Sequence, residues 1–324
     1  METRQGNNKK PLIIITGPTA SGKTQLSIKI AEAINGEIIS ADSMQVYRGM
    51  DIGTAKIRKE EMQGIRHYLI DEFEPWEEFN VAVFKEKCDK YIQEIYSHNK
   101  IPIIAGGTGF YIQAVLYNID FKETATDEAY RKKLWHFASV HGAEALHKEL
   151  ARIDKVSSEI IHPNNIKRVI RAIEYYNQTG TPISQHNEEE RQKEAAYLFQ
   201  YFVLDLPREI LYNRINQRVD IMRENGLENE VKSLMAKGCT KDMVSMQGLG
   251  YKEIIDAITN NKPVEDAFDK IKQETRHFAK RQLTWFKREK NTNWINKEQF
   301  ASEQELVNYC VKECQKIIQP CQEL

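Results

Sequence analysis

The stretch Gly17–Thr24 reads GPTASGKT and meets the pattern G-x-x-x-x-G-K-[ST] in full. It follows an apolar run at residues 12–15, and it leads into residues 25–31, whose apolar side chains recur at helical spacing. A strand, a glycine-rich loop and a helix in this order are the context that a phosphate-binding loop requires, whereas an ordinary glycine-rich turn needs neither flank. The sequence therefore predicts that a phosphate ester binds here.

The residue types of this loop each have a physical task. Gly17 and Gly22 let the backbone turn its N–H groups toward phosphate oxygens, Lys23 adds a positive charge, and the following helix offers its positive dipole end. The Thr24 hydroxyl suits a hard cation such as Mg²⁺. The predicted phosphate-binding set is Gly17, Pro18, Thr19, Ala20, Ser21, Gly22, Lys23 and Thr24.

Two carboxylates follow predicted strands. Asp42 comes after the short run at residues 37–40, and Asp71 ends the run at residues 67–71. In α/β folds the chemistry lies at the carboxyl ends of the strands, which would place Asp42 in the site. An Asp in such a place also commonly caps a helix or turn. Capping explains Asp42 equally well, and for Asp71 it is the commoner explanation.

A third junction carries glycines. Residues 101–105 have the pattern of a buried strand, and Gly106–Gly109 follow with the sequence GGTG. A glycine pair at this place either lets a ligand approach the backbone closely or forms a tight turn, and both interpretations remain open.

The elements that position these residues alternate between strand and helix from residue 12 to residue 116, which predicts an α/β core with a parallel sheet. Residues 126–185 are helix after helix, and strand character returns at residues 197–206. We therefore expect a P-loop NTPase-like parallel sheet with an inserted all-helical domain, and an exposed linker at residues 185–194. The expected parts are a first core part at 1–120, the insertion at 121–196, a second core part at 197–295 and a helical tail at 296–324.

Two smaller groups of cations each have two explanations. Lys167, Arg168 and Arg171 lie on one helical turn with no acid among them, which suits a phosphate backbone or a solvated helix face. Arg214 and Arg218 lie four residues apart on one helix face. One of them reaches a phosphate site, or both form surface ion pairs.

Residues 271–290 are the second unusual stretch. They hold seven Lys or Arg and two Glu, a local charge of +5, and His277, Phe278, Trp285 and Phe286 are interleaved with the cations. Cations for the backbone and aromatic rings for stacking are what single-stranded RNA requires. An amphipathic core helix explains the same pattern, and the two explanations are compatible.

Composition narrows the class of protein. The 324 residues are 41% hydrophobic and 29% charged with a formal net charge of −1, so any nucleic-acid surface must be local. Five Cys, an odd number, argue against a disulfide framework, and no apolar run approaches the ~20 residues that span a bilayer. Residues 1–10 are polar and do not form a signal peptide. We therefore expect a cytoplasmic monomer without membrane contact.

Six segments occur in a specific order: GPTASGKT, SADSMQVYRGMDIGTAK, IPIIAGGTGFY, HPNNIKRVIRAIE, QGLGYKE and TRHFAKRQLTWFK. From residue 12 to about residue 294 the chain resembles the bacterial tRNA dimethylallyltransferases, also called isopentenyltransferases. The second segment is the most specific, because ordinary P-loop kinases lack it. Two departures stand out. Gln247 replaces an Arg of some relatives, and no His pair follows the late cysteines as in the zinc finger of eukaryotic relatives.

This resemblance implies transfer of a dimethylallyl group from dimethylallyl diphosphate to N6 of the adenosine on the 3′ side of the anticodon, with release of diphosphate. Asp42 matches the family's general base. Thr19, Lys23 and Arg218 match its residues around the diphosphate, and Thr24 matches the position at Mg²⁺, which would neutralise the leaving group. The implied cofactor is Mg²⁺.

The resemblance also implies a partner, the anticodon stem-loop of tRNA, whose target base would be flipped toward Asp42. The residues that match the family's tRNA contacts are Asp42, Ser43, Met44, Gln45, Thr108, Arg131, Ile166, Lys167, Arg168, Val169, Ile170, Gln247, Gly248, Leu249, Gly250, Tyr251, Lys252, Lys280, Arg281, Gln282, Thr284 and Trp285.

Two other functions fit a phosphate loop. A P-loop kinase of a nucleoside or other small molecule would turn over ATP, but it would leave the basic aromatic stretch at residues 275–288 without a role. An RNA-binding nucleotide switch would need no base beside the phosphate loop, and Asp42 speaks against it. The transferase is the favoured hypothesis.

Overall fold

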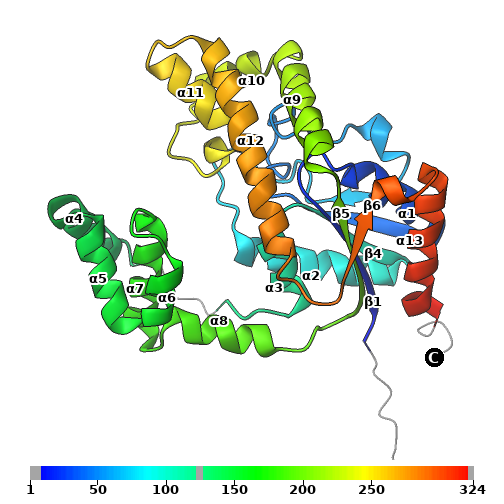
Figure 1. The fold of residues 1–324 in the computed structure, drawn as a ribbon, viewed down its shortest axis with the longest axis horizontal. Coiled ribbons are helices and arrows are strands. Elements are labelled where there is room, and N and C mark those ends of the chain that lie inside the picture. Colours follow the sequence, from blue (N-terminus) through cyan, green and yellow to red (C-terminus); the bar gives the residue numbers. More distant parts are fainter. Residues whose placement is uncertain (1–8, 122–126, 320–324) are drawn as a thin grey trace, which may run out of the picture. The chain divides into compact units, whose positions relative to one another are not determined.

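The fold is described from a computed structural model that covers residues 9–121 and 127–319 (Figure 1). Within these residues the strands form one six-stranded parallel sheet in the order β3-β2-β4-β1-β5-β6. The strands are β1 (Pro11–Thr16), β2 (Gly36–Ala41), β3 (His67–Tyr68), β4 (Ile101–Gly106), β5 (Leu198–Asp205) and β6 (Thr292–Asn296).

The position of β1 decides where the chemistry lies. This strand is buried along its whole length, and Ile13 pairs with Ile103 of β4 on one side and with Gln200 of β5 on the other. The loop after β1 therefore leaves the middle of the sheet at the carboxyl ends of the strands, where open α/β sheets bind ligands. The predicted α/β class with a P-loop NTPase-like sheet is confirmed.

The chain divides into two compact units, Met1–Leu116 with Ala196–Leu324, and Tyr117–Ala195. The first unit, called the core unit below, contains the sheet. Its helices are α1 (Lys23–Ile34), α2 (Val81–Ser97), α3 (Gly109–Leu116), α9 (Arg208–Glu224), α10 (Leu227–Ala236), α11 (Tyr251–Thr259), α12 (Val264–Phe286) and α13 (Glu303–Ile318).

An apolar cluster fixes α1 and α13 to the sheet. Alternate residues of β1, Ile13 and Ile15, pack in it with Ile30 of α1 and with Cys310 and Cys314 of α13. Figure 1 shows these two helices beside each other at the sheet. Cys310 and Cys314 are thus buried thiols of a core helix, and burial raises the pKa of Cys310 to about 12.

The second unit, called the helical unit below, has its own core. Leu146, Leu150, Val169, Ile170 and Ile173 are buried together in it. Its helices are α4 (Glu128–His141), α5 (Ala143–Ile153), α6 (Lys155–Ile160), α7 (Ile166–Thr179) and α8 (Ile183–Gln192).

Two local expectations from the sequence were wrong. The acidic run expected as an exposed linker forms α8, because Asp154 accepts a hydrogen bond from the first-turn amide of Ser184 at 3.0 Å and the ring of His186 lies on Tyr175. The strand expected through Asp71 ends at Tyr68, because Leu69 has a left-handed backbone with φ of 60°. Among the described residues no helix is long and apolar enough to cross a membrane.

Candidate active site

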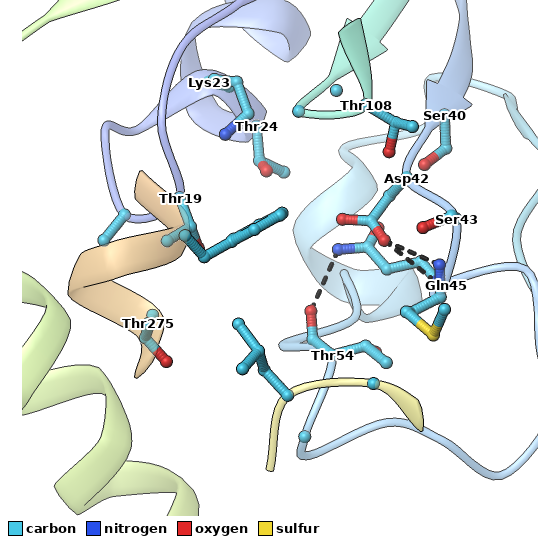
Figure 2. Close-up of a pocket in the computed structure, with 18 of the residues that line it drawn as sticks. Thr19, Lys23, Thr24, Ser40, Asp42, Ser43, Gln45, Thr54, Thr108 and Thr275 are labelled. Carbon is cyan, nitrogen blue, oxygen red and sulfur yellow. Dashed lines mark hydrogen bonds between the residues drawn. The ribbon is translucent and has the colours of Figure 1, made fainter. Parts of the chain in front are cut away.

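One cavity of about 540 Å³ lies at the carboxyl ends of the strands in the core unit (Figure 2). The loop after β1, the segments after β2 and β4, and helices α9, α11 and α12 line it. The lining residues whose side chains could bind a ligand or take part in a reaction include Thr19, Lys23, Thr24, Asp42, Thr108, Arg218 and Gln282.

The phosphate loop has a backbone that its glycines permit. Gly17 has φ of 145°, and a Cβ there would lie 2.7 Å from the Leu204 carbonyl oxygen of β5. Gly22 has φ of 88° just before α1 begins. The Lys23 Nζ donates to the Pro18 carbonyl oxygen at 2.9 Å across the loop. The sequence predicted both glycines for this reason, and the conformation at each is one that other residues rarely adopt.

Lys23 is poised for an anion. Burial, together with the nearby Arg218 guanidinium, lowers its pKa to about 7, although the Asp42 carboxylate acts in the opposite direction. Burial likewise lowers the pKa of Arg218. A desolvated cluster of cations is stabilised when a phosphate group enters it, because the new anion offsets both the burial and the mutual repulsion.

Residues far apart in sequence fix the outer side of the loop. Arg218 of α9 donates to the Thr19 hydroxyl at 3.1 Å. Gln282 of α12 accepts from the Thr19 backbone amide at 2.9 Å and donates to the Gly107 carbonyl oxygen at 3.0 Å. One buried amide side chain therefore joins the phosphate loop to the turn after β4.

The position of Asp42 is compatible with both interpretations that the sequence left open, a cap of the turn and a residue of the site. Its Oδ1 accepts from the Met44 amide at 2.9 Å and from the Gln45 amide at 3.3 Å, so it caps the turn after β2. The same carboxylate points into the cavity near Thr108 and faces Thr19 across it (Figure 2). Capping thus holds the carboxylate in place without removing it from the site.

The turn after β4 is tight for two reasons. A Cβ on Gly106 would lie 2.3 Å from the Ala41 carbonyl oxygen, and one on Gly109 would lie 2.2 Å from the Trp285 ring. The Thr108 amide donates to the Ala41 carbonyl oxygen at 3.1 Å. Both glycines are therefore needed for packing, while the backbone of this turn also lines the cavity.

Comparison with known proteins assigns the chain to a family. The model of the family described as IPP transferase matches residues 45–289. A tRNA dimethylallyltransferase of Lachnoclostridium phytofermentans is 57% identical over 303 residues, which cover 94% of this chain and 97% of the relative. The chain belongs to the IPP transferase family.

Other relatives agree with this assignment. A tRNA dimethylallyltransferase of Acetivibrio thermocellus is 52% identical, with 91% of this chain and 95% of the relative covered. The crystal structure of a tRNA isopentenylpyrophosphate transferase of Staphylococcus epidermidis has a TM-score of 0.70 at 47% identity, covering 95% and 100% of the two chains. A eukaryotic dimethylallyltransferase described as acting on tRNA has a TM-score of 0.77 at 28% identity, covering 94% and 80%. The chain is thus an enzyme of the prenyltransferase class, and the kinase alternative has no support.

The predicted RNA contacts of this IPP transferase fall into three groups. Those of the core unit that line the cavity are Asp42, Ser43, Met44, Gln45, Thr108, Gln247, Gly248, Leu249, Tyr251, Lys252, Arg281 and Gln282. The remaining contacts of the core unit do not line the cavity: Lys280 and Thr284 of α12 are exposed, Trp285 packs edge-on against Phe110, and Gly250 is the buried N-cap residue of α11.

In the helical unit, Lys167 and Arg168 are exposed at the start of α7, but the side chains of Val169 and Ile170 lie in its core. Arg131 and Arg171 both bind Oε2 of the buried Glu174, at 2.9 and 3.2 Å. The sequence showed no acid on the first turn of α7; the next turn supplies one.

Asp71 proves structural. Lys56, almost fully buried, donates to the Asp71 carboxylate, to Asp51 at 2.7 Å and to the Tyr47 carbonyl oxygen at 2.6 Å. This ion-pair group fixes the loop between β2 and β3, and Asp71 is not among the described residues that line the cavity. A role like that of a Walker-B acid therefore has no support in its position.

Lys297 is a cation beside the phosphate loop that the sequence did not indicate. It follows β6 in the segment expected as a helical tail, yet its Nζ lies 2.5 Å from the position that a Cβ on Gly22 would occupy. Burial lowers its pKa, and Arg214 of α9 lowers it further. Its sequence neighbourhood gives no signal, because only the parallel pairing of β6 with β5 brings residue 297 to the loop.

Mg²⁺ was expected at Thr24. Among the described residues no group of three or more His, Cys, Asp or Glu side chains forms a metal cage. Thr24, exposed to the cavity beside Lys23, offers one hydroxyl. This donor set fits Mg²⁺, which is commonly held by few protein oxygens together with substrate phosphates and water.

Proposed function

We propose that this enzyme transfers a dimethylallyl group from dimethylallyl diphosphate to N6 of the adenosine on the 3′ side of the anticodon in tRNA. The observation that carries the proposal is the arrangement of the cavity. The carboxylate of Asp42 faces a phosphate loop that contains Lys23 and that Arg218 contacts. The relatives named tRNA dimethylallyltransferase support the same donor and acceptor.

The proposed reaction is a substitution at the first carbon of the allylic donor. The N6 nitrogen forms a bond to this carbon, the bond from carbon to the diphosphate oxygen breaks, and diphosphate leaves with the bonding electrons. The N6 proton passes to the Asp42 carboxylate, which later returns it to solvent. Because Asp42 is held by two backbone amides, little reorganisation is needed at the moment of transfer.

The leaving diphosphate gains charge at the oxygen that departs. Lys23, Arg218 and the Thr19 hydroxyl surround the place where this charge develops. Thr24 is the residue that would hold Mg²⁺ together with diphosphate oxygens, and a bound ion would neutralise part of that charge.

We further infer that the helical unit contacts the anticodon stem-loop. Lys167 and Arg168 project from the first turn of α7, and Asn165 caps the helix by accepting from the Arg168 amide. Exposed cations next to a helix N-terminus are a common arrangement for phosphate contacts.

The test is direct. The purified enzyme is incubated with Mg²⁺, dimethylallyl diphosphate and unmodified tRNA. The tRNA is then digested, and the masses of its nucleosides are measured by mass spectrometry. We expect a new adenosine heavier by one dimethylallyl group, lost when the target adenosine is replaced by guanosine. ATP consumption on a small-molecule acceptor without this product would contradict the proposal.

A further inference from the structure

Glu230 of α10 makes an unusual set of contacts for a residue outside the cavity lining. Its carboxylate accepts from three consecutive backbone amides, Asp51 at 2.9 Å, Ile52 at 2.8 Å and Gly53 at 3.1 Å. It also accepts from the Tyr251 hydroxyl at 2.6 Å. All four partners are donors, and they come from two segments about 200 residues apart, a spacing read directly from their numbers.

The first segment leads to Asp42 through hydrogen bonds. Gly53 precedes Thr54, whose carbonyl oxygen accepts from the Gln45 side chain at 3.2 Å (Figure 2). The backbone amide of Gln45 in turn donates to Asp42 Oδ1 at 3.3 Å. The loop from Asp42 to Thr54 is therefore fixed at one end by Asp42 itself and at the other by Glu230.

The second segment also lines the cavity, so that the two segments form two of its walls. Tyr251 begins α11, and its ring lies so close to Gly53 that a Cβ there would be 2.5 Å from it. Gly248, just before α11, lies beside Met44, and a Cβ on it would be 3.1 Å from the sulfur. The two walls thus meet at Gly53 and at Met44.

The chemistry of this position favours a carboxylate. Three amides and one hydroxyl, all donors, are matched by two oxygens with room for four hydrogen bonds. A charged acceptor makes each bond stronger than a neutral one does. An amide side chain would turn its own N–H₂ group toward some of these donors, so it would leave them unpaired and push the walls apart.

We propose that Glu230 is a positioning residue that holds the Asp42 loop against the Gly248–Lys252 turn, and so sets the distance from the base to the acceptor nitrogen. The inference rests on the proposed transfer reaction. It predicts that Glu230 affects the transfer step and tRNA use, while diphosphate binding stays intact, because β1, α1 and Gln282 hold the phosphate loop independently.

The experiment compares Glu230→Gln with Glu228→Gln, a control on the same helix whose carboxylate pairs with Lys232 on the surface. The measurements are the single-turnover rate of transfer, the KM for tRNA and the affinity for inorganic diphosphate. For Glu230→Gln we expect a rate lower by about 30-fold and a raised KM, since small misplacements cost this much. We expect diphosphate affinity within about twofold of the wild type, and no change in the control.

Tyr251→Phe provides a second, milder variant that keeps the ring against Gly53. It removes one donor from Glu230, and we expect a rate lower by about threefold with unchanged diphosphate affinity. A wild-type rate in Glu230→Gln overturns the inference. Equal losses of rate and diphosphate affinity also overturn it, because they show general damage to the fold. An inactive wild type overturns the proposed function and this inference with it.

Discussion

The cations at the phosphate loop and those of the helical unit are held in opposite ways. At the phosphate loop, Lys23 and Arg218 are desolvated, and burial lowers the pKa of both. Arg218 donates a hydrogen bond to Thr19, which lies 199 residues away in the sequence. In the helical unit, Lys167 and Arg168 are exposed, and the partly buried Arg131 is neutralised by Glu174.

This difference teaches what each unit is suited to bind. A desolvated cation cluster binds one compact anion at one place, so each residue has a large effect and salt screens it little. An exposed cation surface binds an extended polyanion through many weak contacts, so each residue has a small effect and salt screens it strongly. Single substitutions should therefore separate the two units by magnitude and by salt dependence.

Asp42→Asn tests the core site most severely. The amide keeps an oxygen for the Met44 and Gln45 amides, so the turn should survive, but it cannot accept a proton. Loss of a general base predicts a single-turnover rate lower by about 1,000-fold. Binding of tRNA, measured by filter retention, should stay within about twofold. Turnover near the wild-type rate would remove Asp42 from the role of base.

Gln282→Leu tests whether the phosphate loop depends on its remote support. The change leaves the Thr19 amide and the Gly107 carbonyl without partners, which destabilises the fold by about 2 kcal/mol and loosens the loop. We expect the KM for dimethylallyl diphosphate to rise by about tenfold. Gln273→Leu, at an exposed position of the same helix, is the control. Equal KM values in the two variants would show that the loop stands without this bridge.

The contrast between local and remote support also explains what the sequence could reveal. The phosphate loop, the parallel sheet and the position of Asp42 follow from short motifs with correct flanks, because glycine spacing and strand ends are local signals. Three other contacts depend on strand order and helix packing: that of Gln282 with Thr19, that of Lys297 with Gly22, and that of Glu230 with the Ile52 amide in the Asp42 loop. No local pattern encodes such contacts. The sequence pattern also predicted a linker where α8 lies, because the contacts that support this helix come from Asp154 and Tyr175.

The pH dependence of diphosphate binding probes the pKa of Lys23, which burial and Arg218 lower to about 7. The bound anion favours the charged amine, so affinity should be full below pH 7 and fall as pH rises through 7, by about fivefold between pH 7 and pH 8. Calorimetry at pH 8 in buffers of different ionisation enthalpy should detect uptake of about one proton.

Lys23→Arg serves as the reference for this measurement, because Arg stays charged and any titration of the ligand itself is common to both proteins. The difference in proton uptake between the two proteins should be close to that of one group. An identical pH dependence would mean that Lys23 keeps an ordinary pKa, and the contrast between desolvated and exposed cations would lose its main support.

Lys167→Ala with Arg168→Ala tests the helical unit and should have the smallest effect per residue. Removing two exposed cations should weaken tRNA binding by about tenfold at low salt and lower the slope of log affinity against log salt by about 1.5. Lys132→Ala with Lys133→Ala removes the same charge from exposed positions of α4 in the same unit. If contact with phosphates is local, this control changes the slope far less. If both pairs change it equally, the unit acts only through its overall charge. If neither does, α7 presents a solvated face, and tRNA binding belongs to the core unit alone.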